Sequence, residues 1–251
     1  MLARSSVLAV MLAGCDFVFG VNGQPEPCEL RSFGGATRTE IVEAEEFSVD
    51  WDQTFAVFSQ GGLNWQMKLP DGTPEMIDLG VYVNLTFALA PEGTSLFFTA
   101  AIEPPTLRGA LRDASTWAIS AEVPRGTYAG TPSADAFGPR RVLVRLRYEL
   151  DEIQEYEDDS GHWVAVGQPI TVRTQTAPNL TPNGLTMVYS ALEPELGPGV
   201  YAQSRTSVDE PFGAPVLLRE GKARAAQLCG RCQQLYVVGD GEGSTLVRYD
   251  R

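Results

Sequence analysis

The chain repeats a pattern in which an extended stretch is followed by a tight turn and then by three apolar residues. The clearest copy is NLTPNGLTMVYS (179–190), with a Pro-Asn-Gly turn ahead of Met187-Val188-Tyr189. Four other segments share the pattern: FSVDWDQTFAVFS (47–59), FALAPEGTSLFFT (87–99), SADAFGPRRVLVR (133–145) and AQLCGRCQQLYVV (226–238). Short apolar runs bounded by Gly, Pro, Asn and Asp are typical of strands buried on both faces. Since no comparable segment has a 3.6-residue period, the pattern predicts an all-β protein.

The spacing of the copies predicts how these strands are grouped. Successive turns are 40, 46, 45 and 48 residues apart, measured between Trp51, Pro91, Phe137, Pro182 and Gly230. Units of this length can each hold four short strands, as the blades of a β-propeller do. The third copy is the weakest, because Asp135 stands in a slot that is apolar in the other four. We therefore expect a small closed β-propeller over residues 33–251, most simply with five blades.

The two ends of the repeat region predict how the ring closes. The last copy leaves room for only three strands before residue 251, whereas residues 37–43 form a strand that belongs to no copy. FGGA (33–36) precedes the first turn by 18 residues, and FGAP (212–215) precedes the last turn by the same interval. Pairing of residues 37–43 with the last blade would complete it and cover its exposed edge.

Two motifs in segment 170–218 carry a family resemblance. TPNG (181–184) joins the first two strands of its copy, and FGAP (212–215) precedes the outer strand. With these motifs the segment resembles the TolB-type, WD40-like propeller repeats of bacterial envelope proteins. Elsewhere the match is one of pattern alone, and residues 51–53 and 229–231 depart from the turn consensus. The resemblance implies a protein-interaction role; relatives are often six-bladed, so the count of five comes from the spacing in this chain.

The first residues have the features of an export signal. A positive charge at Arg4 precedes the apolar residues 7–13, which are too few to span a bilayer as a helix. LAGC (12–15) then resembles the lipobox of bacterial lipoproteins, in which the cysteine carries diacylglycerol and begins the mature chain. The alternative is an ordinary secretory signal that contains a cysteine. We expect a signal peptide over residues 1–14, lipidation of Cys15 and a flexible tether over residues 15–32.

Composition narrows the choice of partners. The 251 residues carry a net charge of -13 and are 43% hydrophobic, enough for an ordinary core. A surplus of acids argues against binding to nucleic acid or directly to an anionic lipid surface, since both need a basic face. A lipid anchor needs no such face. We therefore expect attachment to the membrane through the N-terminal lipid and a location in the cell envelope, with inner or outer membrane left open.

Three acids are candidates for lining the channel of the propeller. Five-bladed propellers include glycoside hydrolases that place acids on their inner strands, and this chemistry needs two carboxyl groups at a defined separation. The inner-strand segments here offer Glu46, Asp50 and Asp135. The other copies have Thr86, Asn179 and Gln227 in comparable places. Because a fold does not fix a function, the hydrolase is the alternative reading.

Three cysteines follow the lipobox. Cys229 and Cys232 flank the turn of the last copy, and in an oxidising compartment they are a candidate disulfide. A redox-active pair would need the N-terminus of a helix, which is not expected here. Cys28 lies in the tether, and its pairing with either of the other two is the alternative.

The remaining polar residues predict no metal or cofactor and no committed catalytic residue. The single histidine, His162, follows the acidic run 151–159 and is expected near a hairpin tip, without a nucleophile elbow. The acidic run lacks the spacing of an EF-hand, so a solvated hairpin is favoured over a calcium loop. The sequence thus predicts an envelope lipoprotein that binds a protein, peptide or glycan without catalysis.

Overall fold

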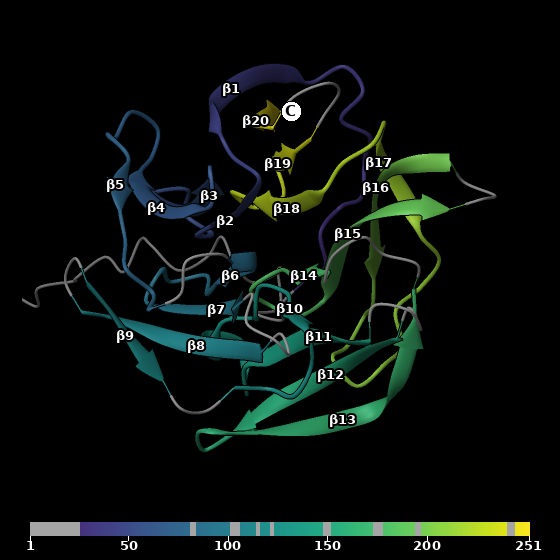
Figure 1. The fold of residues 1–251 in the computed structure, drawn as a ribbon. Coiled ribbons are helices and arrows are strands. Elements are labelled where there is room, and N and C mark those ends of the chain that lie inside the picture. Colours follow the sequence, from purple (N-terminus) through teal and green to yellow (C-terminus); the bar gives the residue numbers. More distant parts are fainter. Residues whose placement is uncertain are drawn as a thin grey trace, which may run out of the picture.

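The computed structural model describes residues 26–80, 84–100, 106–113, 116–120, 123–147, 152–172, 178–193, 197–239 and 244–251. The predicted signal peptide, the candidate lipidation site Cys15 and the first part of the tether lie outside these residues. The described strands form five antiparallel sheets of four strands each, arranged around a common centre (Figure 1). The fold is a five-bladed β-propeller, which confirms the predicted class and blade count.

The blades follow one another along the chain. Blade 1 contains β2 (Glu46–Val49), β3 (Phe55–Gln60), β4 (Leu63–Lys68) and β5 (Glu75–Met76). Blade 2 contains β6 (Asn84–Leu89), β7 (Ser95–Ala100), β8 (Thr106–Asp113) and β9 (Thr116–Ser120). Blade 3 contains β10 (Tyr128–Ala129), β11 (Arg141–Arg147), β12 (Glu152–Asp159) and β13 (His162–Thr171). Blade 4 contains β14 (Asn179–Leu180), β15 (Thr186–Glu193), β16 (Gly197–Ser204) and β17 (Val216–Glu220).

Blade 5 is built from both ends of the described chain. It contains β18 (Ala225–Cys229), β19 (Gln234–Val238), β20 (Thr245–Asp250) and β1 (Thr37–Glu43). The outer strand β1 pairs antiparallel with β20, in a register that runs from Thr37 opposite Asp250 to Glu43 opposite Thr245. The predicted closure of the ring by residues 37–43 is therefore confirmed.

The core consists of hydrophobic clusters in the seams between neighbouring blades. Side chains alternate along a strand, so the second strand of a blade serves two seams. In β3, Ala56 and Phe58 pack toward blade 5, whereas Phe55 and Val57 pack toward blade 2. This double coverage explains why the second strand of each copy is a continuous apolar run.

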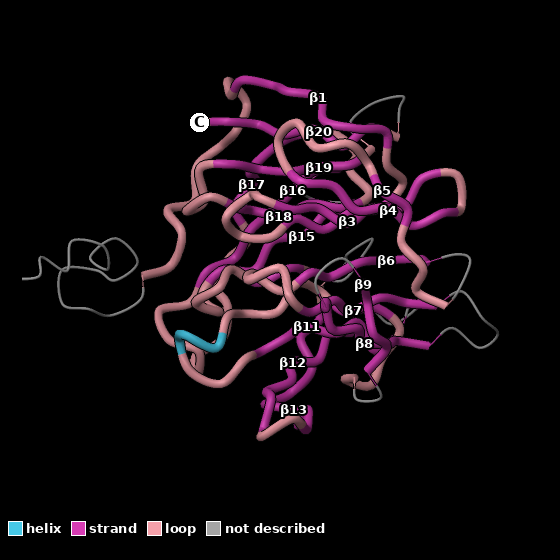
Figure 2. The backbone as a smooth tube through the Cα atoms, turned by 90° about the vertical axis from the view of Figure 1, so that its left-hand side faces the viewer, coloured by secondary structure: helices cyan, strands magenta, loops and turns pink. Residues whose placement is uncertain are grey.

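Blade 3 differs from the prediction at its inner strand. The N–H of Gly130 donates to Leu143 O and that of Ser133 donates to Arg141 O, both at 2.8 Å. These two bonds place Thr131 at the inner-strand position that the comparison of the five copies assigned to Asp135. The chain then makes a longer turn containing the 3-10 helix η1 (Asp135–Phe137), drawn in cyan at one end of the sheets in Figure 2. Asp135 is thus a turn residue, and its predicted place on an inner strand is wrong.

Candidate functional site

The turns between the first and second strands of the blades share one face of the propeller, which we call the mouth. They comprise residues 50–54, 90–94, 130–140, 181–185 and 230–233. Residues from all five turns, together with residues 26–31, line a cavity of about 1040 Å³ on this face. The mouth is therefore a site to which every blade contributes.

Main-chain hydrogen bonds connect neighbouring turns at the mouth. The N–H of Gly230 donates to Trp51 O at 3.1 Å, and the N–H of Trp51 donates to Pro91 O at 3.0 Å. On the other side, the N–H of Ala134 donates to Pro182 O at 2.8 Å. Backbone groups paired in this way hold the rim in a fixed shape.

Side chains of the inner strands connect adjacent blades beneath the mouth. Gln227 donates from Nε2 to Val49 O at 2.6 Å and accepts from the Val49 N–H at 3.0 Å, as a neighbouring strand would. Asn179 accepts from the Thr131 N–H at 2.8 Å and donates to Ala226 O at 2.7 Å. Asn179 and Gln227, which the alignment placed toward the channel, therefore join inner strands of different blades.

Asp50 is buried and shapes a turn. Its Oδ1 accepts from the N–H groups of Thr54 and Phe55, both at 2.8 Å, and its Oδ2 accepts from the Thr54 hydroxyl at 2.6 Å. In blade 4 the Thr181 hydroxyl likewise accepts from the N–H five residues later, that of Thr186. Burial raises the pKa of the Asp50 carboxyl, although these hydrogen bonds act in the opposite direction.

Glu46 lies at the far end of the same inner strand, away from the mouth. Burial raises the pKa of its carboxyl to about 8, against the opposing charge of Arg224. Asp50 is four residue steps along the extended chain from Glu46, which corresponds to roughly 13 Å between their Cα atoms. Glycoside hydrolases need their two carboxyl groups within about 5–9.5 Å. The main-chain spacing of the two acids of blade 1 is therefore larger than this carboxyl separation.

Asp135, the third candidate acid, is exposed at the mouth. Its Oδ1 pairs with Nε of Arg140 at 2.9 Å, and Arg140 also pairs with Glu92 of blade 2 at 3.3 Å. Partial desolvation raises the pKa of the Asp135 carboxyl, Arg140 opposes this rise, and the carboxylate of Glu92 adds to it. The structure thus places the three predicted acids in three different surroundings. A catalytic role for them stays a prediction.

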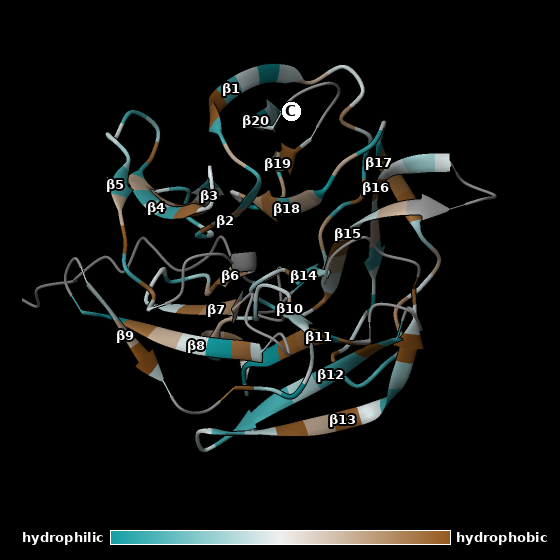
Figure 3. Ribbon diagram, in the orientation of Figure 1, coloured by the Kyte–Doolittle hydropathy of each residue, from teal (hydrophilic) through white to brown (hydrophobic). Residues whose placement is uncertain are grey.

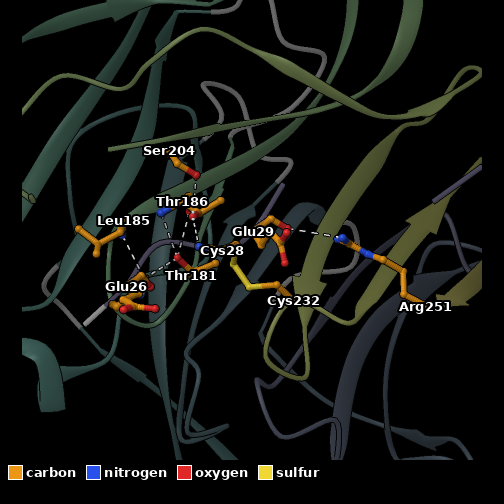
Figure 4. The surroundings of a disulfide bond; sticks show 10 residues. Glu26, Cys28, Glu29, Thr181, Leu185, Thr186, Ser204, Cys232 and Arg251 are labelled. Carbon is orange, nitrogen blue, oxygen red and sulfur yellow. Dashed lines mark hydrogen bonds between the residues drawn. A yellow bond between two sulfur atoms is a disulfide. The ribbon is translucent and has the colours of Figure 1, made fainter. Parts of the chain in front are cut away.

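The cysteines pair differently from the prediction. Cys232 forms its disulfide with Cys28, with Cα atoms 5.9 Å apart (Figure 4). Cys229 is a buried free thiol. Cys229 ends β18 and packs in the seam between blades 5 and 1, whereas Cys232 packs in the seam between blades 4 and 5. The two side chains point into opposite seams, so the predicted Cys229–Cys232 bond is wrong and one of the alternative pairings is present.

Residues 26–31 form one wall of the mouth cavity. Glu26 O accepts from the Asn183 side chain, the Cys28 N–H donates to Thr186 Oγ1 at 3.0 Å, and Glu29 O accepts from Arg251 at 3.5 Å (Figure 4). The part of the predicted tether next to the propeller is thus fastened to blades 4 and 5. Sequence reasoning missed this wall, and the only signal for it was the odd cysteine in the tether.

The remaining lining of the mouth is mixed in charge. Asp52 and Glu92 come from the turns of blades 1 and 2, whereas Arg231 and Arg251 come from blade 5. The half-buried ring of Trp51 adds apolar surface. The mouth can therefore offer both signs of charge and an aromatic face to one ligand. Within the described ranges, no three His, Cys, Asp or Glu side chains come together as a metal site.

A buried ion-pair cluster near the mouth also escaped the sequence analysis. Arg205 donates to both carboxylate oxygens of Glu155, at 2.7 and 2.9 Å, and Arg141 contacts the same carboxylate at 3.5 Å. Glu155 lies on β12, a largely hydrophilic strand drawn in teal in Figure 3. The guanidinium of Arg205 also stacks on Phe212 of the FGAP motif. The FGAP motif was the sequence signal that could have indicated this cluster, because an arginine stacks on its aromatic ring.

Comparison with known proteins identifies the fold. No known protein family and no curated protein matches the chain. Solved structures similar to it include TolB from Acinetobacter baumannii, with a TM-score of 0.51 and 12% identity over 86% of this chain and 55% of that one. A protein from Agrobacterium tumefaciens described as TolB gives 0.50 and 13%, over 79% of this chain and 69% of that one. A gluconolactonase from Xanthomonas campestris gives 0.53 and 13%, over 81% and 70%.

These similarities show the architecture alone. The identities are too low to carry a function from any of the three proteins to this chain, and the chain spans about half of the Acinetobacter protein. The three similar structures are two TolB proteins and one enzyme, so the fold is compatible with a binding role and with a catalytic role. No helix in the described part of the chain is long and apolar enough to cross a membrane.

Proposed function

We propose that the protein is a lipid-anchored module of the bacterial envelope that binds a protein, peptide or glycan at the mouth without catalysis. The observation that carries the proposal is the mouth cavity, which all five blades line. Its volume of about 1040 Å³ is at the upper end of the range of ligand-binding clefts. The hydrogen-bonded turns give it a preformed rim, so little ordering is needed on binding.

Affinity capture with charge reversals tests the mouth. Asp52→Arg and Arg231→Glu change exposed charges of the cavity rim, and Glu45→Arg and Lys222→Glu are matched reversals at the opposite face. We expect capture of the partner from envelope extract to fall at least about tenfold for the two mouth variants and to stay unchanged for the controls. Equal capture by all four folded variants, with folding checked by circular dichroism, would contradict binding at the mouth.

Cys15→Ser tests the anchor separately. Acyl chains on Cys15 would hold the protein to a membrane by burying their methylenes. The variant is therefore expected in the soluble fraction and the wild type in the membrane fraction. Retention of the variant in membranes would exclude lipidation of Cys15 as the anchor.

A glycan hydrolase is the second candidate, and one observation favours it. With a pKa of about 8, Glu46 is protonated at neutral pH, as a general acid must be. Replacing Glu46, Asp50 and Asp135 together with Ala and assaying glycan binding and hydrolysis separates the candidates. Loss of a measurable hydrolysis would support the enzyme, and unchanged behaviour would remove it.

A further inference from the structure

The disulfide between Cys28 and Cys232 sets the place where the chain leaves the folded domain. Cys28 is joined to the turn of blade 5, so the chain leaves from the rim of the mouth (Figure 4). Without this bond residues 26–31 keep only hydrogen bonds to blades 4 and 5. The next fully buried residue is Phe33, which donates its N–H to Leu218 O of β17 at 2.7 Å. The chain would then leave from the seam between blades 4 and 5.

The bond also shortens the chain that connects Cys15 to the domain. Cys28 is 13 residues from Cys15, and Phe33 is 18 residues from it. At about 3.5 Å per residue, the fully extended lengths are roughly 45 Å and 60 Å. The disulfide therefore keeps the rim of the mouth within about 45 Å of whatever holds Cys15.

The size of the domain makes this restriction directional. A domain of about 225 residues has a radius of gyration near 17 Å and is about 45 Å across. To present the opposite face to the membrane, the tether would have to run from the mouth around the side of the domain. That path takes almost its full extended length, at a large cost in chain entropy. Without the disulfide the tether is longer and leaves from the seam, so it can reach either face of the domain without full extension.

We propose that the Cys28–Cys232 disulfide turns the mouth toward the membrane that holds Cys15, and that the partner of the mouth is a polypeptide anchored in the same membrane. This inference rests on the anchor and the mouth binding proposed above. The net charge of -13 opposes an anionic lipid surface as the occupant. A polypeptide segment can meet the carboxylates of Asp52 and Glu92 and the guanidiniums of Arg231 and Arg251 at once.

Energy transfer on vesicles measures the orientation. A fluorescent amino acid is placed at Asp52, which is exposed at the mouth, or at Leu63, which is exposed at the opposite end of the same blade. The lipidated full-length protein is reconstituted into vesicles that carry acceptor headgroups. Transfer should be clearly stronger from position 52 than from position 63. Equal transfer from both positions, or stronger transfer from position 63, overturns the proposal.

Two variants test whether the disulfide causes the asymmetry. Cys28→Ser with Cys232→Ser should make transfer from the two positions nearly equal, because the tether becomes longer and leaves from the seam. About ten Gly and Ser residues inserted after Asp16 should have the same effect while the disulfide and the fold stay intact. If the double variant does not fold, the insertion decides alone. Asymmetry that survives the insertion overturns the proposal.

A second form of the experiment separates this inference from the anchor. Protein that begins at Asp16 with an N-terminal hexahistidine tag is bound to nickel-chelating lipids, which hold the same tether without acylation of Cys15. The asymmetry between positions 52 and 63 should reappear. A full-length protein that stays soluble would refute the lipid anchor, whereas a symmetric signal from the tagged protein would refute the orientation.

Photo-crosslinking in intact envelopes identifies the class of partner. A benzophenone amino acid at position 52 should yield a protease-sensitive product that is extracted with detergent from the membrane fraction. The same group at position 63 should not yield it. Products that contain only lipid, or a partner that stays soluble without detergent, would overturn the assignment of a membrane-anchored polypeptide.

Discussion

In blade 4, Arg205 directly follows the third strand, and its Cζ lies 4.3 Å from the centre of the Phe212 ring. In blade 5, Arg251 directly follows the third strand, and its Cζ lies 3.8 Å from the centre of the Phe33 ring. Both phenylalanines begin a Phe-Gly motif ahead of the outer strand. The same two residue types thus meet at the same place in two blades.

The surroundings of these two pairs are different. Arg205 is buried and bound to Glu155 of blade 3, whereas Arg251 is exposed at the mouth and donates to Glu29 O. The rings are reversed: Phe33 is fully buried, and Phe212 is half-buried. The repeat specifies the contact between the arginine and the phenylalanine. The contacts with the neighbouring blade determine which of the two residues is buried and stabilises the fold. In blade 4 that member is the arginine, and in blade 5 it is the phenylalanine.

The arginines give the largest expected difference. Arg205→Leu leaves the buried carboxylate of Glu155 with only the longer contact to Arg141, and we expect it to lower the free energy of unfolding by about 3–5 kcal/mol. Arg251→Leu removes an exposed charge and should lower it by less than about 1 kcal/mol. Urea unfolding of both variants measures the difference, and equal losses would contradict the comparison.

A double variant shows whether the unpaired charge is the cause. Arg205→Leu together with Glu155→Leu removes both buried charges, and Arg141 keeps its ion pair with Glu157 at 2.7 Å. The double variant should therefore be more stable than Arg205→Leu alone, since a buried ion pair and an apolar pair of similar volume have similar net energies. A double variant that is no more stable than the single one would point to lost packing instead.

The phenylalanines should show the opposite ranking. Phe33→Ala empties a fully buried position in the seam between blades 4 and 5, and we expect it to lower the free energy of unfolding by about 3–4 kcal/mol. Phe212→Ala removes a half-buried ring and should lower it by about 1–2 kcal/mol. Thermal unfolding followed by circular dichroism compares the two. If Phe212→Ala lowered the free energy of unfolding by more than Phe33→Ala, the phenyl ring of Phe33 would not be the main support of blade 5.

The repeats explain why much of the fold was predictable. Apolar runs such as Ala56-Val57-Phe58 recur because the second strand of each blade is covered on both faces. The strand at residues 37–43 belonged to no copy, and the last blade was the one with an unpaired edge for it to join. The site was less predictable because it depends on contacts across the ring. The bond between Cys28 and Cys232 spans 204 residues, and the pairing of Glu155 with Arg205 joins two blades. No local pattern specifies which distant partner a side chain meets.

The seam between blades 5 and 1 extends the comparison to a second glutamate. Glu155 is held by two guanidinium groups, whereas Glu46 is half-buried and the charge of Arg224 only partly offsets the effect of burial on the pKa of its carboxyl. Burial therefore raises the pKa of Glu46 to about 8, compared with 4.5 in an unfolded chain. The folded protein binds a proton more tightly than the unfolded one, so this group stabilises the fold below about pH 4.5. The stabilisation is lost as the pH rises toward 8.

Glu46→Gln should remove this pH dependence. Relative to the variant, the wild type should be about equally stable at pH 4 and less stable by up to about 5 kcal/mol at pH 9, because the carboxyl of Glu46 must ionise there. Urea unfolding between pH 4 and pH 9 measures the difference. Glu45→Gln is the matched control: it removes the neighbouring exposed carboxylate, which raises the pKa of Glu46 only as the weakest of its causes. Parallel stability curves for the wild type and Glu46→Gln would mean that the carboxyl of Glu46 is solvated in the folded protein. Its pKa would then not be raised, and Glu46 would differ from Glu155 in being exposed to water.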